Sequence, residues 1–510
     1  MVDFFISLTK SFWNSVGFPM LFVVAIIAIF VFEKEKLKRY TFLWYTCLVF
    51  IFIYNPITLL VCKMILEKST FEQYYLRFFG VAPIMFVIAF GFTLAASKLQ
   101  GIKKLIAVAC LTAVICLAGK CLYTQPWFTK AENRNKVPQD VVTLCDIFAD
   151  YSEDTIRIMA PQRLAVYLRQ MESRFSMPYA RSVPDEGLEL TALKPDVKSV
   201  ADYAAENDVD YVVVWAVDET LNAYLNYGFT LFGRTANYAV LQPYQPSWIM
   251  TEYDMTSGDQ GIFYTVENIA DGTFIVIDGG DAQNEQQVRD VIMDHGGVVD
   301  AWIITHYHQD HVDAFNAIYP NPKGIDIKQV YVTPLDADVF YSVAQEWDDV
   351  DSFNTFINIT KDAKNINNVS RNDALQFDDL TITFFNAYDE VVTAGGDIPN
   401  NDSLVFKLAT ANRSALIMGD CHSDFMAEYF IKTYGDKLNA DILQLAHHGN
   451  NSIPVETGFY DVVSPEVAVF DTPDKIMQSP NYTAGALAAY FIENNVRIIW
   501  YNTAPNQFGL

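Results

Sequence analysis

A short cluster of histidines constrains this chain more than any other feature. Residues 305–311, Thr-His-Tyr-His-Gln-Asp-His, hold three of the seven histidines of the 510-residue protein, together with one carboxylate. The residues before the cluster, 299–304, are mostly apolar and predict a buried strand. Imidazole and carboxylate groups are the side chains that bind Zn²⁺ and similar cations. The sequence therefore predicts a strand that carries metal ligands into a loop.

Two later segments have the same form, an apolar run that ends in candidate ligands. Residues 415–418 are followed by Asp420, and residues 442–445 are followed by His447 and His448. Six of the seven histidines fall at or beside these three strand ends, which favours one shared metal site over separate structural histidines. We therefore expect the three segments to meet at one edge of the fold.

These residues carry a resemblance to a known family. The cluster at 306–311 resembles the His-x-His-x-Asp-His signature of the metallo-β-lactamase superfamily. Residues of about 248–510 are most similar to the hydrolase domain attached to ComEC-type competence membrane proteins. The resemblance implies an α/β fold, an αββα sandwich in which two stacked sheets lie between helices. The remaining motifs of the family would correspond to Asp278, Asp420 and His447-His448.

The resemblance also implies a dinuclear metal centre. Two divalent ions would bind, Zn²⁺ by expectation, with Mn²⁺ or iron as alternatives. Asp278 would hold the histidine loop by hydrogen bonds without touching a metal. His448 is the less expected ligand beside His447, and that choice stays open. The implied ligands are His306 and His308 for the first ion, Asp310, His311 and His447 for the second, and Asp420 for both.

One departure from the family pattern affects the first ion. Many members have another histidine between the cluster and the bridging aspartate, whereas this chain has none from residue 312 to residue 421. The first ion would keep an open position for water or substrate, unless His422 fills it. Tyr307 and Gln309, which alternate with the ligands, are expected to face outward.

The expected chemistry is hydrolysis. Coordination lowers the pKa of water to about 7 in favourable cases, so a hydroxide that bridges two cations can attack phosphorus, and Asp310 would orient it. A protonated His448 or His422, or a metal-bound water, would then serve the leaving group. We expect a metal-dependent hydrolase of a phosphoester, with a small-molecule or cell-envelope substrate. The alternatives are a ComEC-like DNA-uptake or nuclease component, and a non-catalytic surface protein that retains a metal site.

The charge distribution bears on the DNA alternative. Beyond Tyr123 the chain has 23 Lys and Arg against 56 Asp and Glu, a net charge of −33. Such a surface repels polyanions, whereas nucleic-acid binders usually carry a basic footprint. We therefore expect no nucleic-acid partner.

The first 123 residues contain four apolar segments, at about 13–32, 41–62, 79–97 and 105–123. A helix needs about 20 residues to cross a bilayer, so these segments predict an all-α transmembrane region of four helices. The loops after the first and third segments hold seven basic residues, against four on the opposite side. By the positive-inside rule this bias predicts a multi-pass protein of the cell membrane, with its soluble domains on the extracytoplasmic side.

The rest of the chain divides into three parts. Residues 124–137 form a polar linker after the membrane domain of residues 1–123. In residues 138–245 strands alternate with helices, which indicates a small α/β domain of unassigned role, with Ser199 as the expected N-cap of one helix. Residues 246–510 are rich in predicted strands and form the expected hydrolase domain.

Overall fold

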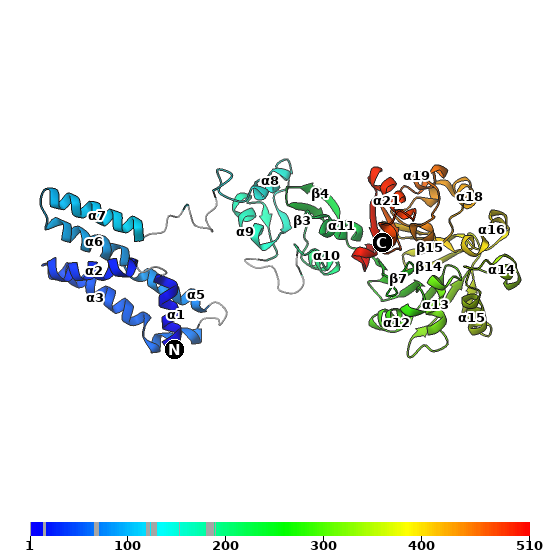
Figure 1. Cartoon of the computed structure of the whole chain (residues 1–510), viewed down its shortest axis with the longest axis horizontal. Coiled ribbons are helices and arrows are strands. Elements are labelled where there is room, and N and C mark those ends of the chain that lie inside the picture. The colour runs from blue at the N-terminus through cyan, green and yellow to red at the C-terminus, as the bar shows by residue number, and fades with distance from the viewer. Residues whose placement is uncertain are drawn as a thin grey trace. The chain divides into compact units, whose positions relative to one another are not determined.

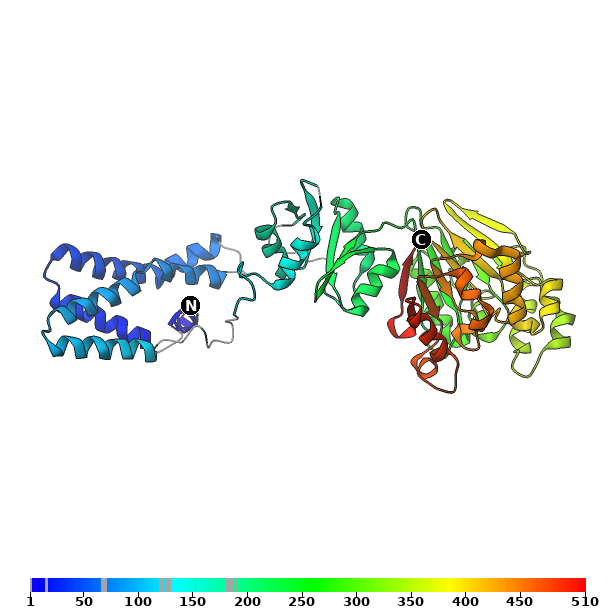
Figure 2. The same cartoon turned by 90° about the horizontal axis from the view of Figure 1, so that it is seen from above.

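The computed structural model describes residues 2–13, 17–65, 71–118, 123, 130–151, 153–179, 188 and 190–510. The chain divides into two compact units, Met1–Ala131 and Glu132–Leu510 (Figure 1 and Figure 2). The described part of the first unit is helical, and the second contains strands and helices. The chain is therefore a mixed α/β protein, as expected.

Two helices form the centre of the first unit. α2 packs on α6 so closely that a Cβ on Gly91 would lie 2.6 Å from the carbonyl oxygen of Ala25. Small residues permit such approaches between helices in membranes. The helices are α1 (Val2–Trp13), α2 (Gly17–Phe32), α3 (Lys36–Ile53), α4 (Pro56–Ile65), α5 (Phe71–Leu76), η1 (Arg77–Val81), α6 (Ile84–Ser97) and α7 (Ile102–Ala118).

The expected membrane spans are reproduced in part. Within the described residues, one helical stretch, Tyr74–Ser97, is long and apolar enough to cross a membrane. The pairs α1 with α2 and α3 with α4 meet the same criterion only if each bent pair, at 90° and 59°, counts as one span, which gives at most three spans. The prediction of four spans stays a prediction, and residues 119–122 of the fourth expected segment lie outside the described residues.

The second unit begins with a five-stranded sheet in the order β2-β1-β3-β5-β4, with apolar clusters on both faces. The carboxylate of Asp196 accepts the backbone N–H of Ser199 and caps α10, so the prediction of Ser199 as the cap was wrong. The elements are α8 (Gln139–Ile147), β1 (Ile156–Met159), α9 (Gln162–Met171), β2 (Phe175–Ser176), α10 (Val197–Glu206), β3 (Tyr211–Trp215), α11 (Asp218–Tyr227), β4 (Thr230–Arg234) and β5 (Tyr238–Gln242).

Two seven-stranded sheets follow, in the orders β13-β12-β10-β8-β7-β6-β21 and β14-β15-β16-β17-β18-β19-β20. The first contains β6 (Trp248–Glu252), β7 (Phe263–Asn268), β8 (Phe274–Asp278), β10 (Ala301–Ile304), β12 (Val330–Val332), β13 (Ile366–Asn368) and β21 (Asn506–Gly509). The second contains β14 (Ala374–Phe377), β15 (Leu380–Asn386), β16 (Val405–Ala409), β17 (Ser414–Ile417), β18 (Ile442–Gln444), β19 (Val467–Phe470) and β20 (Arg497–Trp500).

The two sheets pack face to face, because alternate residues of each sheet contribute to one core between them. Ile275 and Ile277 of β8 lie in this core together with Ile417 of β17. Val276, between Ile275 and Ile277, and Leu416, directly before Ile417, point the other way and lie in the core beneath the helices. Strands that are apolar on both faces require such a cover on the outside of each sheet.

Helices supply that cover, and the layers run helix, sheet, sheet, helix. Figure 1 shows α12, α13 and α15 along one side of the sheets, with α18 and α19 along the other. The main helices are α12 (Glu285–Asp294), α13 (Gln309–Ile318), α14 (Ala337–Val343), α15 (Val350–Thr360), α18 (Asp424–Tyr434), α19 (Phe459–Val463) and α21 (Ala484–Glu493).

The histidine cluster lies where β10 gives way to α13. His308 is the N-cap residue of this helix, and Asp310 and His311 lie in its first turn. Tyr307 is buried, and its hydroxyl donates a hydrogen bond to the carbonyl oxygen of Thr333. The prediction that Tyr307 faces outward was wrong, because its ring fills the core between the sheet and α15.

Candidate metal centre

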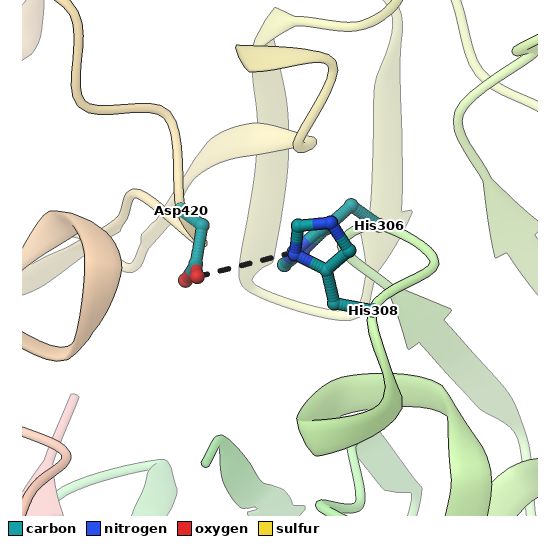
Figure 3. Close-up of side chains that lie close together, drawn as sticks. All are labelled: His306, His308 and Asp420. Atoms are coloured by element: carbon teal, nitrogen blue, oxygen red, sulfur yellow. Dashed lines mark ion pairs between the residues drawn. The ribbon is translucent and has the colours of Figure 1, made fainter. Parts of the chain in front are cut away.

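Strand ends of both sheets bring the candidate ligands together. β8 and β10 are parallel neighbours in one sheet, and β17 and β18 are parallel neighbours in the other. Parallel neighbours present their carboxyl ends at the same edge, where sites on α/β sheets form. Figure 3 shows His306 and His308, from the loop after β10, facing Asp420 from the loop after β17.

The first group of side chains that can hold a cation consists of His306, His308 and Asp420. Nε2 of His306 lies 3.9 Å from Oδ2 of Asp420, and both residues are buried. The three candidate ligand atoms lie within 4.8 Å of one another. Two imidazoles and one carboxylate at this spacing match the donor set expected of a zinc-type site.

The second group consists of Asp310, His311 and His448. Nε2 of His448 lies 3.2 Å from Oδ2 of Asp310 and 3.4 Å from Oδ2 of Asp420. Nε2 of His311 lies 3.3 Å from Oδ1 of Asp420. The carboxylate of Asp420 therefore lies between the two groups, with one oxygen toward His306 and the other toward His311.

The structure places the two adjacent histidines differently. His447, the residue expected to be a ligand, does not join either group; its Nε2 lies 3.8 Å from Oδ2 of Asp420, and its side chain is 23% exposed. His448, expected to act in catalysis, is buried within the second group. Both backbones are left-handed, with φ of 53° and 59°, so the tight turn between them directs the two rings differently.

Unsatisfied buried atoms test whether the residues fit a metal. Buried polar atoms are nearly always hydrogen-bonded, and an orphan calls for an explanation such as an ion. Within the described part of the chain, several buried atoms in this small region make no hydrogen bond, and five of them belong to candidate metal ligands and face the site. They are Nε2 of His306, His308, His311 and His448, and Oδ1 of Asp420. These atoms are the donors that divalent cations prefer, so the site fits two metal ions.

Asp278 fixes the orientation of His311 from the end of β8. Its Oδ2 lies 2.8 Å from Nδ1 of His311 and accepts a 2.6 Å hydrogen bond from the hydroxyl of Thr305. Its Oδ1 accepts the backbone N–H of Thr305 at 2.7 Å. A histidine that donates from Nδ1 presents Nε2 as an acceptor, so this contact sets the tautomer that a metal ligand needs.

Gly419 permits the close approach of Asp420. The glycine has φ of +52°, and a Cβ there would lie 2.9 Å from Cβ of Ser403 and 3.1 Å from Cβ of Thr305. The hydroxyl of Ser403 accepts the backbone N–H of Asp420 at 3.0 Å. A side chain at position 419 would therefore separate the loop of Asp420 from the loop of the histidines.

Asp348 is a residue that the sequence analysis missed. This buried carboxylate, in the segment between α14 and α15, has its Oδ1 3.3 Å from Nε2 of His308. It stands beside the first group. His422 does not join that group, since its Nδ1 is bonded to the carbonyl oxygen of Asp420 and its Nε2 lies 3.4 Å from Asp397. Asp348 follows no strand, so no pattern singled it out.

The two groups differ in charge. Burial, followed by the neighbouring charge of His311, lowers the pKa of His306 well below its ordinary value. Burial also disfavours the charged form of His448, but Asp420 and Asp310 outweigh it and raise the pKa of His448 to about 10. His306 thus offers a neutral imidazole, whereas His448 holds a proton that a bound cation would displace.

A cavity of about 650 Å³ opens over the two groups. His308, Asp310, Asp420 and His447 line it from the metal centre. The other lining residues are Asp259, Gln260, Asp281, Ala282, Gln283, Gln309, Asp313, Trp347, Asp349, Asn400, Asn450, Ile476 and Tyr482. Its volume falls within the range of small-molecule sites.

No model of a known protein family and no curated protein matches the chain. Among solved structures, it is similar to the metallo-β-lactamase fold protein YhfI from Bacillus subtilis, at 12% identity and a TM-score of 0.33, over 51% of this chain and 98% of that one. A possible metal-dependent hydrolase from Veillonella parvula matches at 13% identity and a TM-score of 0.31, over 52% and 100%. CmlA, a diiron β-hydroxylase from Streptomyces venezuelae, matches at 12% identity and a TM-score of 0.33, over 62% of each chain. The function is argued below from the geometry of the chain itself.

Proposed function

We propose that this protein is a membrane-anchored, metal-dependent hydrolase of the metallo-β-lactamase type that acts on a phosphoester. The observation that carries the proposal is the position of Asp420 between the two groups. Its Oδ2 lies 3.9 Å from Nε2 of His306 and 3.4 Å from Nε2 of His448, and its Oδ1 lies 3.3 Å from Nε2 of His311. Its burial among unsatisfied imidazole nitrogens supports two cation sites that share one carboxylate. Paired sites of this kind suit displacement at phosphorus.

The side chains have separate tasks in this proposal. His306, His308 and Asp420 would hold one ion, and Asp310, His311, His448 and Asp420 the other. When bound, two such cations supply Lewis-acid activation of water and of the phosphoryl group. Asp278 accepts the proton of Nδ1 of His311, which would leave Nε2 to face the ion when a cation is bound.

His447 is the residue best placed to exchange a proton with the leaving group. Its Nδ1 lies 2.7 Å from the carbonyl oxygen of Asn450, so Nδ1 donates and Nε2 remains free. The residue lines the cavity but belongs to neither candidate ligand group. This assignment replaces His448 in the role of the proton donor, because His448 would be committed to a metal.

The anchor is proposed to consist of four membrane spans, with the hydrolase unit outside the cytoplasm. Exposed apolar side chains on the helices of the first unit, such as Val23, Ile27 and Phe86, support contact with lipid. The excess of basic residues in two alternate loops supports the orientation. A reporter enzyme fused to the C-terminus tests it, and reporter activity in the cytoplasm would refute the extracytoplasmic placement.

The test of the function uses the full chain purified in detergent. We expect two divalent ions per chain by elemental analysis and turnover of bis(p-nitrophenyl) phosphate. Asp420→Ala is expected to abolish both, whereas Asp362→Asn, an exposed carboxylate away from the cavity, is expected to change neither. Bound metal without turnover of any ester would instead favour a non-catalytic protein. Strong cleavage of single-stranded DNA would favour the nuclease alternative.

A further inference from the structure

The cavity over the metal centre is strongly acidic. Six of its lining residues are aspartates, and none of the described lining residues is Lys or Arg. Two of the six, Asp310 and Asp420, belong to the candidate metal centre, where cations would compensate them. Asp259 forms an ion pair with Lys475. Three carboxylates, those of Asp281, Asp313 and Asp349, remain without a basic partner among the described residues.

The contacts of these three carboxylates within the described residues are with uncharged groups. Asp281 uses one oxygen to accept the backbone N–H of Gln283. Asp313 accepts a 3.1 Å hydrogen bond from the side-chain amide of Asn316. Asp349 precedes α15 with φ of 37°, and its carboxylate makes no cap hydrogen bond. Gathering like charges in one cavity is unfavourable unless a cation compensates them.

A second observation shows that the same cavity is built to receive a ligand. His308 is 9% exposed and Asp420 is 1% exposed, both line the cavity, and each has a buried polar atom without a hydrogen-bond partner in the described chain. The carboxylates therefore adjoin a prepared site. They do not form an isolated acidic surface.

Two exposed aromatic residues line the cavity beside the carboxylates. The side chains of Trp347 and Tyr482 are 72% and 45% exposed, so their ring faces are accessible to a ligand in the cavity. An ammonium group is attracted both to carboxylates and to the face of an aromatic ring. The carboxylates of Asp281, Asp313 and Asp349 would repel a phosphate diester that carries a second anionic group.

We propose that the substrate is a phosphoester that carries an alkylammonium group, with its phosphoryl group at the metal centre and its ammonium group against Asp281, Asp313, Asp349, Trp347 and Tyr482. The inference rests on the proposed hydrolase function and specifies its substrate class. In the reaction, water forms a new bond to phosphorus and the bond from phosphorus to the leaving oxygen breaks. One proton of the water goes to the departing alkoxide, and the other is released from the phosphate product to solvent.

Two esters with the same leaving group distinguish recognition of the positive charge of the substrate from recognition of its shape. p-Nitrophenyl phosphocholine has a quaternary ammonium group, and p-nitrophenyl 3,3-dimethylbutyl phosphate has an uncharged group of the same shape. For the full-length, metal-loaded protein in detergent, we expect kcat/KM for the choline ester to exceed that for its neutral analogue by about tenfold or more, as for a partly desolvated cation–π and carboxylate contact. Equal values would overturn the inference and leave the hydrolase function intact.

Asparagine substitutions test the carboxylates without disturbing the backbone. Asn also caps helices and tolerates left-handed φ, so Asp281→Asn and Asp349→Asn keep the local conformation while removing charge. In the double variant we expect kcat/KM for the choline ester to fall about tenfold, and that for bis(p-nitrophenyl) phosphate to rise. The exposed Asp362→Asn is the matched control. An unchanged ratio between the two esters in the double variant would overturn the assignment.

Binding supplies a readout that does not depend on turnover. By calorimetry, phosphocholine should bind the wild-type protein about tenfold more tightly than 3,3-dimethylbutyl phosphate, and the double variant should lose this difference. If no ester is hydrolysed but this preference persists, the proposed function fails while the recognition of the cation stands. Equal binding of the two phosphates would contradict the inference in either case.

The ammonium phosphoester has two sources, a lipid headgroup and a soluble ester. Vesicles of phosphatidylcholine and solutions of glycerophosphocholine distinguish them, with phosphatidylglycerol and glycerol 3-phosphate as controls that lack the ammonium group. Release of product from either choline compound, with slower release from its control, supports the inference and names the source. Faster turnover of the anionic controls would refute it.

Discussion

Nε2 of His448 lies 3.2 Å from Oδ2 of Asp310, in a contact that joins a loop of one sheet to a loop of the other. We therefore expect His448→Ala to reduce bound metal from two ions to one per chain, because the second group loses a buried imidazole. His447→Ala is expected to keep both ions and to lower kcat by about 10²-fold or more, as for the loss of a general acid. Elemental analysis and steady-state kinetics measure the two effects. The reverse pattern would restore His447 as the ligand.

Replacing Asp278 is expected to weaken metal binding, although Asp278 is not itself a candidate ligand. Asp278→Asn is expected to weaken binding by about 10- to 100-fold, because the amide no longer stabilises the Nδ1–H tautomer of His311 as a carboxylate does. Titration with a chelator of known affinity measures the change. Asp300→Asn, which also removes a carboxylate beside β8, serves as the comparison. Equal affinities for the wild type and Asp278→Asn would show that the contact has no role in the site.

Asp348 is expected to matter for the first ion only. Its Oδ1 lies 3.3 Å from Nε2 of His308, the nitrogen that faces the first group, so the carboxylate is placed to contribute directly to the first site. Asp348→Asn is therefore expected to lose affinity at one of the two sites by about 10-fold or more. Two resolved steps in the same chelator titration would reveal which site weakens. A uniform loss at both sites, or no loss, would contradict the assignment of Asp348 to the first group.

Replacing Gly419 is expected to destabilise the fold for two separable reasons, its left-handed backbone and its close contact with Ser403. Gly419→Ala is expected to lower the free energy of unfolding by about 2–4 kcal/mol, since left-handed φ and a clash with Ser403 act together. Gly272→Ala shares a positive φ, of +76°, but its Cβ would meet nothing within 4 Å. It should therefore show only the smaller effect of the backbone. Similar losses in both variants would mean that the contact with Ser403 is unimportant.

Because the carboxylate of Asp471 is buried, we expect the folding stability of the protein to depend on pH. Burial raises the pKa of Asp471 to about 7, against hydrogen bonds from Tyr264 and Gln444 that lower it. Because this value exceeds the ordinary 3.8 of an unfolded chain, the folded state binds the proton more tightly, and stability falls as pH rises from about 4 to 7.

The variant Asp471→Asn tests this dependence, because an amide does not ionise. We expect the melting temperature of the variant, relative to that of the wild type, to increase between pH 5 and pH 8. Thermal denaturation of the full chain in detergent at several pH values measures the difference. A difference that does not change with pH would show that Asp471 keeps one protonation state over this range.

Much of the strand content and the position of the site could be predicted from the sequence. Apolar runs such as 274–277 and 442–445 became strands because residues buried on both faces leave a continuous hydrophobic pattern. The candidate ligands His306, His308 and Asp420 could be named because each follows such a run within a few residues. The helix α13 was missed, since its first turn is made of polar candidate ligands that mask its apolar periodicity.

The chain by itself determined the donor types, their strand ends and the acidic character of residues 124–510, because these follow from local pattern and composition. The different placements of His447 and His448 arise only in three dimensions, since two left-handed residues turn adjacent side chains in different directions. The contact of Asp348 with His308 was likewise decided by the packing of the segment between α14 and α15 against the site. The acidic cavity formed because loops distant in sequence converge at the ends of the parallel strands.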